Sequence, residues 1–272
     1  MRTILALALV LGLASTASAA PGRYAKIGGL DMYYEVHGQG APLVLLPGGL
    51  CTIDSCFGKV IPLLARTHKV IALEQQAHGH TNDVDRPLDF DQMARDTVAL
   101  LAQLKIEQAD FLGYSVGGAV GLRVAIQKPA LVRRLVVLAA GHSNDAWQPG
   151  LLQGMAQLTP ESIPPLFRDA YAKTAPDPKH FPVLVEKIKQ LAATAKPLSD
   201  AQVRAIRIPV LVMVGDRDII RTEYALQLSH LLPQAQLAVL PGSDHFAVMA
   251  HADWVASLSL GFLEAPAAVA TK

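Results

Sequence analysis

Short apolar runs alternate along this chain with segments in which apolar residues recur every three or four positions. The continuous apolar runs, which we expect to be strands, lie at residues 32–36, 42–46, 69–73, 109–112, 135–138, 210–214 and 236–240. The helical spacing occurs at residues 90–104, 116–127, 222–231 and 254–263. Strands that are apolar throughout and separated by helices are typical of a parallel sheet covered on both faces. The pattern therefore predicts an α/β fold.

The alternation is interrupted between residues 142 and 207. This segment is rich in proline, contains no clean strand, and has short helical patterns such as residues 183–191. Because a bare loop of this length is uncommon inside a compact domain, we expect a small helical insertion that caps one end of the sheet. The predicted organisation is a core of residues 20–141 and 208–264, a helical cap of residues 142–207 and a flexible tail of residues 265–272.

The first 19 residues have the layout of a secretory signal peptide. Arg2 supplies a positive start, residues 4–13 form a short apolar run, and Ala17-Ser18-Ala19 is a small-residue cleavage pattern. The apolar run is shorter than the roughly 20 residues that span a bilayer. We therefore expect an exported protein, periplasmic or secreted, with no stable membrane anchor after cleavage. An uncleaved anchor or a misassigned start codon is the alternative.

Composition narrows the class of protein further. Hydrophobic residues make up 51% of the 272 residues and charged residues 17%, so the chain can form a large core and is not of the disordered type. The formal net charge is +1, and Lys and Arg are scattered along the chain. Because a nucleic-acid-binding face needs clustered basic residues, we expect no nucleic acid partner.

The most informative motif is Gly113-Tyr114-Ser115-Val116-Gly117, which lies between a predicted strand and a predicted helix. The spacing G-x-S-x-G suits a very tight strand-to-helix turn, because glycines two residues before and after the serine leave room for the crossing backbone. The turn places the Ser115 hydroxyl at a helix N-terminus, where the free N–H of Val116 can point at an oxyanion. A turn of small residues without any chemistry is the alternative.

Five segments in the same order resemble the α/β-hydrolase superfamily over essentially all of the chain after the leader. They are residues 45–49 (Leu-Leu-Pro-Gly-Gly), 70–81, 110–119 with the serine turn, 215–218 (Gly-Asp-Arg-Asp) and 241–246 (Pro-Gly-Ser-Asp-His-Phe). The resemblance implies a mostly parallel eight-stranded sheet with helices on both faces and a small helical cap. It also implies an esterase-like serine hydrolase that needs no cofactor.

In this superfamily the catalytic residues follow the chain order serine, acid, histidine, which the resemblance carries over to Ser115, Asp218 and His245. His245 lies in a loop after the last predicted strand, and a serine hydroxyl needs such a base at neutral pH. His251 is the reserve. Asp218 matches the family spacing at its strand end. Asp216 is the competing candidate for the acid. If Asp218 is the acid, we expect Asp216 to be a loop or capping residue.

The second oxyanion donor is expected from the loop after the strand at residues 42–46. Gly49 is the first choice and Leu50 the reserve, because glycine lets the backbone approach a substrate carbonyl closely. The sequence departs from the family here, since Pro47 stands where many members have a histidine that supports this loop. Ala77 likewise stands where glycine is more typical.

Substrate choice is expected to depend mainly on the cap. Tyr114, Trp147 and Phe167 are the candidate substrate-binding residues. Other apolar side chains of the cap are available, although most of them are expected to pack the cap onto the core. These are Leu151, Leu152, Met155, Leu166 and Tyr171. We expect the partner to be a small, largely apolar carboxylic ester.

Two residue pairs leave further questions open. Cys51 and Cys56 could form a disulfide in an oxidising compartment, but residues five apart on one helix face each other poorly, so two partly buried thiols are an equal alternative. His78 and His80 alternate in one loop. A catalytic zinc site needs about three protein ligands, so we expect no metal there.

Several other chemistries occur on this fold. Carbon–carbon bond hydrolysis and cofactor-free perhydrolysis use the same serine triad and remain alternatives. Epoxide and haloalkane opening in this family typically uses aspartate at the position of Ser115, which disfavours both. A non-catalytic binding module would be indicated by a missing catalytic residue, whereas Ser115, Asp218 and His245 are all present.

Overall fold

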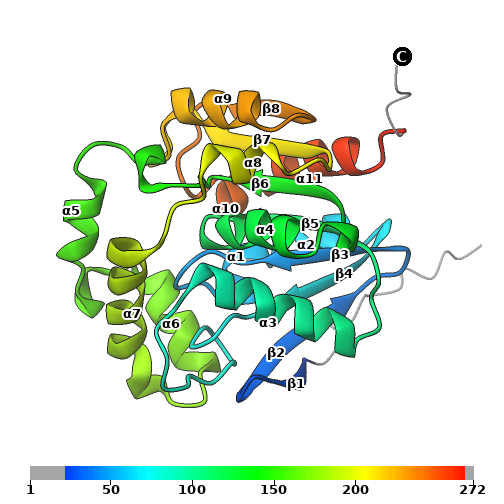
Figure 1. Cartoon of the computed structure of the whole chain (residues 1–272). Coiled ribbons are helices and arrows are strands. Elements are labelled where there is room, and N and C mark those ends of the chain that lie inside the picture. Colours follow the sequence, from blue (N-terminus) through cyan, green and yellow to red (C-terminus); the bar gives the residue numbers. More distant parts are fainter. Residues whose placement is uncertain (1–21, 267–272) are drawn as a thin grey trace, which may run out of the picture.

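A computed structural model describes residues 22–266, so the expected leader at residues 1–19 and the last six residues of the tail, 267–272, lie outside the described part. Figure 1 shows a central sheet with helices on both sides. Eight strands form this sheet in the order β1-β2-β4-β3-β5-β6-β7-β8. The pairs β1–β2 and β2–β4 are antiparallel and the other pairs are parallel, which confirms the predicted mostly parallel eight-stranded sheet.

The observed strands extend the predicted apolar runs by a few residues. They are β1 (Arg23–Ile27), β2 (Leu30–His37), β3 (Ala41–Leu46), β4 (His68–Leu73), β5 (Ala109–Tyr114), β6 (Val132–Leu138), β7 (Val210–Gly215) and β8 (Ala235–Leu240). Strand β1 is absent from the sequence prediction because it is a short edge strand in which exposed Tyr24 and Lys26 alternate with buried Ala25 and Ile27. All residues of β5 and β7 are buried, so these strands lie in the core.

Helices cover the two faces of the sheet (Figure 1). On one face lie α3 (Phe90–Gln103), α4 (Val116–Gln127) and α9 (Thr222–Leu231), and on the other lie α2 (Ile61–Leu64) and α11 (Ala252–Leu263). The short helices α1 (Ile53–Phe57) and α10 (Ala247–Ala250) pack against each other. Within residues 22–266, no helix has both the length and the apolar character of a membrane span.

The segment between β6 and β7 is helical, as its pattern predicts. Its helices are α5 (Leu151–Ala156), α6 (Pro165–Thr174), α7 (Phe181–Thr194) and α8 (Asp200–Arg204). Prolines lie in the first turns of α6 and α7, where a missing N–H removes no helical hydrogen bond, so a proline-rich segment can still form helices. Figure 1 shows α5, α6 and α7 grouped beside the sheet, whereas α8 packs against α4 and α9.

Cys51 and Cys56 form a disulfide, with their Cα atoms 5.9 Å apart. The expected obstacle, that both cysteines lie on one helix, is wrong. Helix α1 begins at Ile53 after the N-cap residue Thr52, so Cys51 lies in the preceding loop. The loop backbone is not bound to helical geometry and can bring Cys51 to Cys56. Both side chains are buried, and the disulfide joins the loop after β3 to α1.

Candidate active site

Ser115 lies on a strained turn between β5 and α4. Its φ of 53° and ψ of −117° are unusual for a residue with a side chain, and it is the N-cap residue of α4. A Cβ on Gly113 would lie 2.3 Å from the carbonyl oxygen of Gly117, and a Cβ on Gly117 would lie 1.9 Å from the carbonyl oxygen of Leu46. Both glycines are therefore required by close backbone contacts, which is the physical reason for the G-x-S-x-G spacing.

Three side chains that are distant in sequence meet at one edge of the sheet. Nε2 of His245 lies 3.0 Å from Oγ of Ser115, and Nδ1 of His245 lies 2.7 Å from Oδ1 of Asp218. Ser115 follows β5, Asp218 follows β7 and His245 follows β8, and the carboxyl ends of these parallel strands share one edge. With the proton on Nδ1 bonded to Asp218, Nε2 is free to accept the serine proton.

The two competing carboxylates make different contacts. The Asp218 side chain is fully buried, and its Oδ1 also accepts the N–H of Ile220 at 3.0 Å. Oδ1 of Asp216 instead accepts the N–H of Ser243 at 3.1 Å. The N–H of Arg217 donates to the Ser243 carbonyl oxygen at 3.0 Å. Asp216 and Arg217 thus join the loop after β7 to the loop after β8, and it is Asp218 that contacts the imidazole.

Two other histidines that follow Ser115 in the sequence, His251 and His142, have different surroundings. The ring of His251, the reserve, stacks on Trp254 with centroids 4.5 Å apart. His142 is buried after β6, where its Nδ1 lies 2.7 Å from the Tyr224 hydroxyl. Burial lowers the pKa of His142, although the nearby Asp200 carboxylate acts in the opposite direction. The imidazole that reaches the serine hydroxyl is therefore the expected one.

The two expected oxyanion donors and the reserve, Val116, Gly49 and Leu50, all line the cavity beside the serine. Val116 is the first residue of α4, so its N–H has no partner within the helix. A Cβ on Gly49 would lie 3.2 Å from Cγ2 of Val116, which places the two residues in contact. Leu50 has a φ of 65°, so the chain turns immediately after Gly49. The two expected donors and the reserve therefore lie near one another.

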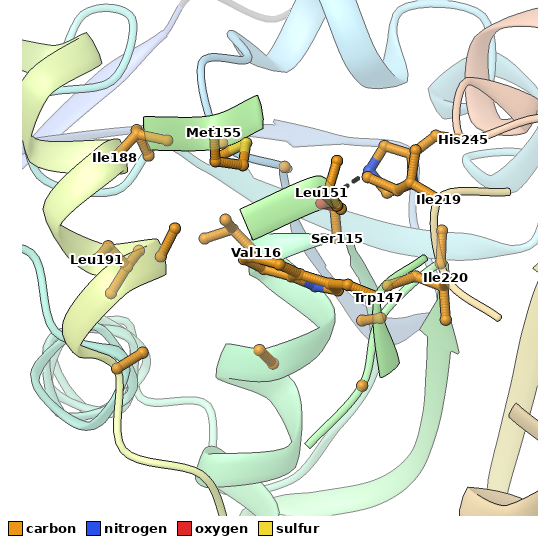
Figure 2. A pocket seen from close by; sticks show the side chains of 18 of the residues that line it. Ser115, Val116, Trp147, Leu151, Met155, Ile188, Leu191, Ile219, Ile220 and His245 are labelled. Carbon is orange, nitrogen blue, oxygen red and sulfur yellow. Dashed lines mark hydrogen bonds between the residues drawn. The ribbon is translucent and has the colours of Figure 1, made fainter. Parts of the chain in front are cut away.

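A cavity of about 270 Å³ adjoins the serine and the imidazole. The three expected substrate-binding residues, Tyr114, Trp147 and Phe167, all line it. Figure 2 shows mostly apolar side chains around Ser115 and His245, from helices of the segment between β6 and β7 and from the loop after β7. The others labelled there are Val116, Leu151, Met155, Ile188, Leu191, Ile219 and Ile220. The cavity is thus suited to an apolar group.

Several lining residues were not identified from the sequence. Ile219 and Ile220 follow Asp218 directly, and Phe246 follows His245, so their proximity in sequence to the catalytic candidates was a usable signal. Ile188 and Leu191 belong to the buried face of α7. Helical spacing identifies such a face as buried, but it does not distinguish contact with the core from contact with a cavity.

Tyr114 packs between the loop after β3, at Gly48, and the imidazole of His245. Its ring centroid lies 5.3 Å from that of His245, and a Cβ on Gly48 would lie 2.8 Å from the Tyr114 ring. Burial, followed by the negative charges of Asp218 and Asp244, raises the pKa of the Tyr114 hydroxyl, which is therefore neutral. The absence of a side chain at Gly48 lets the loop lie directly against this ring.

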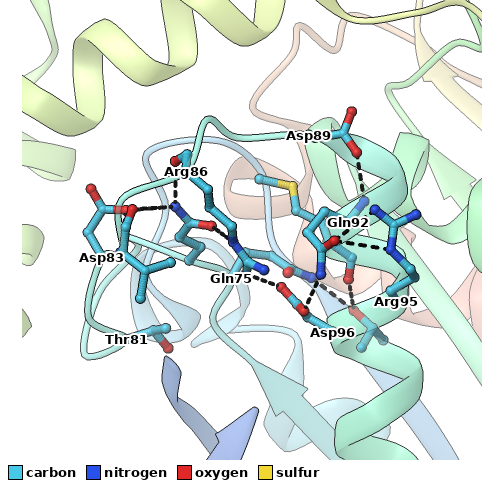
Figure 3. A network of polar contacts seen from close by, with 12 residues as sticks. Gln75, Thr81, Asp83, Arg86, Asp89, Gln92, Arg95 and Asp96 are labelled. Atoms are coloured by element: carbon cyan, nitrogen blue, oxygen red, sulfur yellow. Dashed lines mark hydrogen bonds and ion pairs between the residues drawn. The ribbon is translucent and has the colours of Figure 1, made fainter. Parts of the chain in front are cut away.

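A polar network organises the loop between β4 and α3 (Figure 3). Nε2 of Gln76 donates to Oδ1 of Asp83 at 2.7 Å, and Nε of Arg86 donates to Oε1 of Gln76 at 2.6 Å. Arg86 also pairs with Asp96 on α3. Nζ of Lys187, on α7, donates to Oδ1 of Asp83 at 2.7 Å. The network therefore joins this loop both to the core and to α7.

The charge of Asp83 follows from these contacts. Burial acts to raise its pKa, but hydrogen bonds from Lys187, His180 and Gln76 outweigh burial and lower the pKa of the carboxyl group below its usual value. Nε2 of His180 lies 2.8 Å from Oδ2 of Asp83. Asp83 is therefore an ionised carboxylate. Its hydrogen-bond donors come from Gln76 after β4 and from His180 and Lys187 at α7.

His78 and His80 have separate partners. Nδ1 of His78 lies 2.8 Å from the Gln76 carbonyl oxygen, and Nδ1 of His80 lies 3.0 Å from Oε2 of Glu74. Within residues 22–266, no group of three His, Cys, Asp or Glu side chains is placed to hold a metal ion. Ala77, which lies between Gln76 and His78, is buried with a φ of 64°, and this explains in physical terms why glycine is more typical there.

Comparisons with known proteins identify the family of this chain. A family model described as "Alpha/beta hydrolase family" matches residues 43–258. A 2-hydroxymuconate semialdehyde hydrolase from Pseudomonas sp. (strain CF600) is 31% identical, over 91% of this chain and 95% of its own. Two solved structures share the fold. A meta-cleavage product hydrolase from Pseudomonas fluorescens has a TM-score of 0.76 at 20% identity and covers 90% of this chain and 97% of its own. A carboxylesterase from Bacillus subtilis has a TM-score of 0.76 at 17% identity and covers 91% and 93%. This chain belongs to the α/β-hydrolase family.

Proposed function

We propose that this hydrolase cleaves a small, largely apolar carboxylic ester through an acyl-enzyme intermediate. The observation that carries the proposal is the hydrogen-bonded series Ser115–His245–Asp218, with distances of 3.0 Å and 2.7 Å, beside an apolar cavity. A serine hydroxyl is a poor nucleophile until a positioned base removes its proton, and this series supplies the base and the group that orients it.

The reaction proceeds in two steps. Nε2 of His245 takes the proton of Ser115 as Oγ attacks the ester carbonyl carbon, and the N–H groups of Val116 and Gly49 donate to the oxyanion that forms. The imidazolium then gives its proton to the departing alcohol, which leaves an acyl group on Oγ. Water, deprotonated by the same imidazole, attacks this acyl group. The acyl–Oγ bond then breaks, the imidazolium returns the proton to Oγ, and the carboxylic acid is released. Asp218 holds the ring in the required tautomer throughout.

The cavity suggests which esters fit. Its volume of about 270 Å³ lies just below the usual range of roughly 300–1,000 Å³ for ligand pockets. Most of its lining side chains are apolar, so an uncharged acyl or alcohol group of a few carbons is favoured over a long chain. In this proposal residues 142–207 act as the cap that selects the substrate, because α5 and α7 supply much of the lining.

A fluorophosphonate probe tests the proposal directly. We expect one covalent adduct on Ser115, and we expect Ser115→Ala to abolish both labelling and turnover of p-nitrophenyl acetate and butyrate. A protein that binds these esters without labelling would be the non-catalytic binding module. Retained turnover in Ser115→Ala would mean that another nucleophile is used, and the proposed mechanism would be wrong.

Carbon–carbon bond hydrolysis is the second candidate function, and one observation favours it. The relative that is 31% identical over 91% of this chain is named a 2-hydroxymuconate semialdehyde hydrolase. The same triad could act on a ketone or aldehyde of that type. The two candidates are separated by comparing kcat/KM for 2-hydroxymuconate semialdehyde and for p-nitrophenyl butyrate. A value at least tenfold higher for the semialdehyde would favour the second candidate.

Cofactor-free perhydrolysis is the remaining alternative on this triad, and it is tested by adding hydrogen peroxide and a short carboxylic acid to the protein.

We also propose that the protein is exported. The leader pattern at residues 1–19 supports this, and so does the Cys51–Cys56 disulfide, because disulfides persist in oxidising compartments. N-terminal sequencing of the protein from the periplasm or the medium should begin near Ala20. Full-length protein retained in the cytoplasm with reduced cysteines would contradict export without affecting the proposed chemistry.

A further inference from the structure

Two segments that are distant in sequence form a short antiparallel pair beside the triad. We name residues 145–148, which follow β6, the entry segment, and residues 218–221, which follow β7, the acid loop. Trp147 and Ile220 form an antiparallel bridge between them, outside the main sheet. The entry segment is the start of the helical segment 142–207, so the bridge joins that segment to the loop that bears the proposed catalytic acid.

Backbone hydrogen bonds hold the bridge at both ends. The N–H of Gln148 donates to the carbonyl oxygen of Ile219 at 2.8 Å, and the N–H of Arg221 donates to the carbonyl oxygen of Ala146 at 2.7 Å. Side chains add to these bonds. Nε2 of Gln148 donates to the carbonyl oxygen of Asp218 at 3.2 Å. The Arg221 guanidinium donates to the carbonyl oxygen of Asp145 through Nε at 3.1 Å and through Nη2 at 2.6 Å. The backbone of the acid loop is therefore held by the entry segment.

The position of the acid loop determines the position of the catalytic carboxylate. The N–H of Ile220 donates to Oδ1 of Asp218 at 3.0 Å, and the same oxygen accepts from Nδ1 of His245 at 2.7 Å. A displacement of the backbone at Ile220 would therefore move the oxygen that orients the imidazole. Proton transfer is sensitive to such displacements, because the reacting groups must stay within hydrogen-bond reach.

The same residues form part of the cavity wall. Trp147 from the entry segment lies close to Ile220 from the acid loop, and both face the region around Ser115, with Ile219 nearby (Figure 2). An apolar group of the substrate in this region would contact both segments at once. Substrate contact and acid alignment therefore depend on one local structure.

We propose that the entry segment is a positioning element for Asp218, through the hydrogen bond from the N–H of Gln148 to Ile219. Its role is then to align the proton-transfer groups, in addition to lining the cavity. This inference rests on the proposed function, in which Asp218 orients His245.

One exposed position provides both the test and its control. Gln148→Pro removes the backbone N–H and the side-chain amide, whereas Gln148→Ala removes the amide alone. The Gln148 side chain is exposed, and the preceding residue, Trp147, has φ −81° and ψ 150°, which a following proline tolerates. The difference between the two variants therefore reports on the backbone at this position, through the lost N–H and the fixed φ of proline.

We expect Gln148→Pro to lower kcat for p-nitrophenyl butyrate about tenfold relative to Gln148→Ala, with KM changed less than about twofold. Gln148→Ala should stay within about threefold of the wild-type kcat. In proton NMR spectra, the far-downfield Nδ1–H signal of His245 should shift or broaden in Gln148→Pro and not in Gln148→Ala. A merely structural role would lower the melting temperature without changing this signal.

Arg221→Gln is a milder second variant, for use if Gln148→Pro does not fold. This substitution removes the guanidinium donors to the entry segment, and we expect the same change in the NMR signal as in Gln148→Pro, which the Gln148→Ala control should not show. Equal kcat in both Gln148 variants, or an unchanged signal in Gln148→Pro or Arg221→Gln, would overturn the inference. The proposed function would fail separately, through retained activity in Ser115→Ala.

Discussion

Nζ of Lys187 on α7 lies 2.6 Å from Oδ2 of Asp83, so a helix that lines the cavity is ion-paired to the loop between β4 and α3. The same ammonium group donates to the carbonyl oxygens of Val84 and Arg86 at 3.1 and 2.9 Å. The Lys187 side chain is 15% exposed and that of Asp83 is 11% exposed, so solvent screens the pair only partly. This contact fixes α7 relative to the core.

Replacing Lys187 with methionine should lower the free energy of unfolding by about 1–3 kcal/mol, because one buried partner of Asp83 is lost while His180 and Gln76 remain. Urea unfolding at pH 7 measures the change.

Lys189→Met is the matched control on the same helix. Lys189 pairs at 2.9 Å with Glu186, whose side chain is 53% exposed, so its loss should change stability by less than about 0.5 kcal/mol. Equal effects of the two substitutions would show that the Asp83 contact does not stabilise the fold.

Stability should fall in acid partly through Asp83. Its folded-state pKa is lowered by its hydrogen-bond donors, so its contribution is complete above the pKa of an unfolded aspartate, about 3.9, and is lost as the pH falls through the folded-state value. We expect Asp83→Asn to destabilise the protein at pH 7 and to differ less from the wild type at pH 3. Urea unfolding at both pH values gives the comparison. A difference that stays constant between pH 7 and pH 3 would contradict this assignment.

Gly117→Ala should disrupt the serine turn, because the added Cβ would meet the Leu46 carbonyl oxygen at 1.9 Å. The backbone must shift, and we expect at least about a hundredfold loss of esterase activity, with a destabilisation of about 2 kcal/mol or more. Gly154→Ala is the control, because Gly154 lies inside α5 and an added methyl group there would meet no atom of another segment within 4 Å. That substitution should raise stability by about 0.5–1 kcal/mol and leave the labelling of Ser115 intact. Normal activity in Gly117→Ala would show that the turn tolerates a methyl group.

Ile188→Ala should shift the substrate preference toward longer acyl chains, because it removes a side chain from the cavity wall on α7. We expect the ratio of kcat/KM for p-nitrophenyl hexanoate over acetate to rise about tenfold, in line with the effect of one or two methylenes in an apolar pocket. Val183→Ala on the same helix is the control, because Val183 is 41% exposed and does not line the cavity. An equal change of the ratio in both variants would argue against a role of this wall in acyl selection.

Features that depend on neighbouring residues in the chain could be predicted from the sequence. The G-x-S-x-G spacing follows from close contacts of Gly113 and Gly117, and apolar runs identify strands of a buried parallel sheet because both faces are covered. The family resemblance supplied the order of Ser115, Asp218 and His245, which the structure brings within hydrogen-bond distance.

Features that depend on contacts between distant segments could not be predicted in this way. The bridge of Trp147 to Ile220 involves a single residue on each side and leaves no periodic pattern. The start of α1 was a partial exception, because Thr52 and Ser55 form a capping box whose spacing is visible in the sequence. This capping box places Cys51 before the start of the helix. The objection that two cysteines five residues apart on one helix face each other poorly therefore does not apply to Cys51 and Cys56.

The bonds from Asp216 and Arg217 to Ser243 have a consequence for engineering. Because they couple the loop after β7 to the loop after β8, an insertion that lengthens either loop would displace Asp218 and His245 together. A designer who wishes to broaden the range of substrates should therefore keep both loop lengths fixed and diversify the inward-facing positions of α5 and α7.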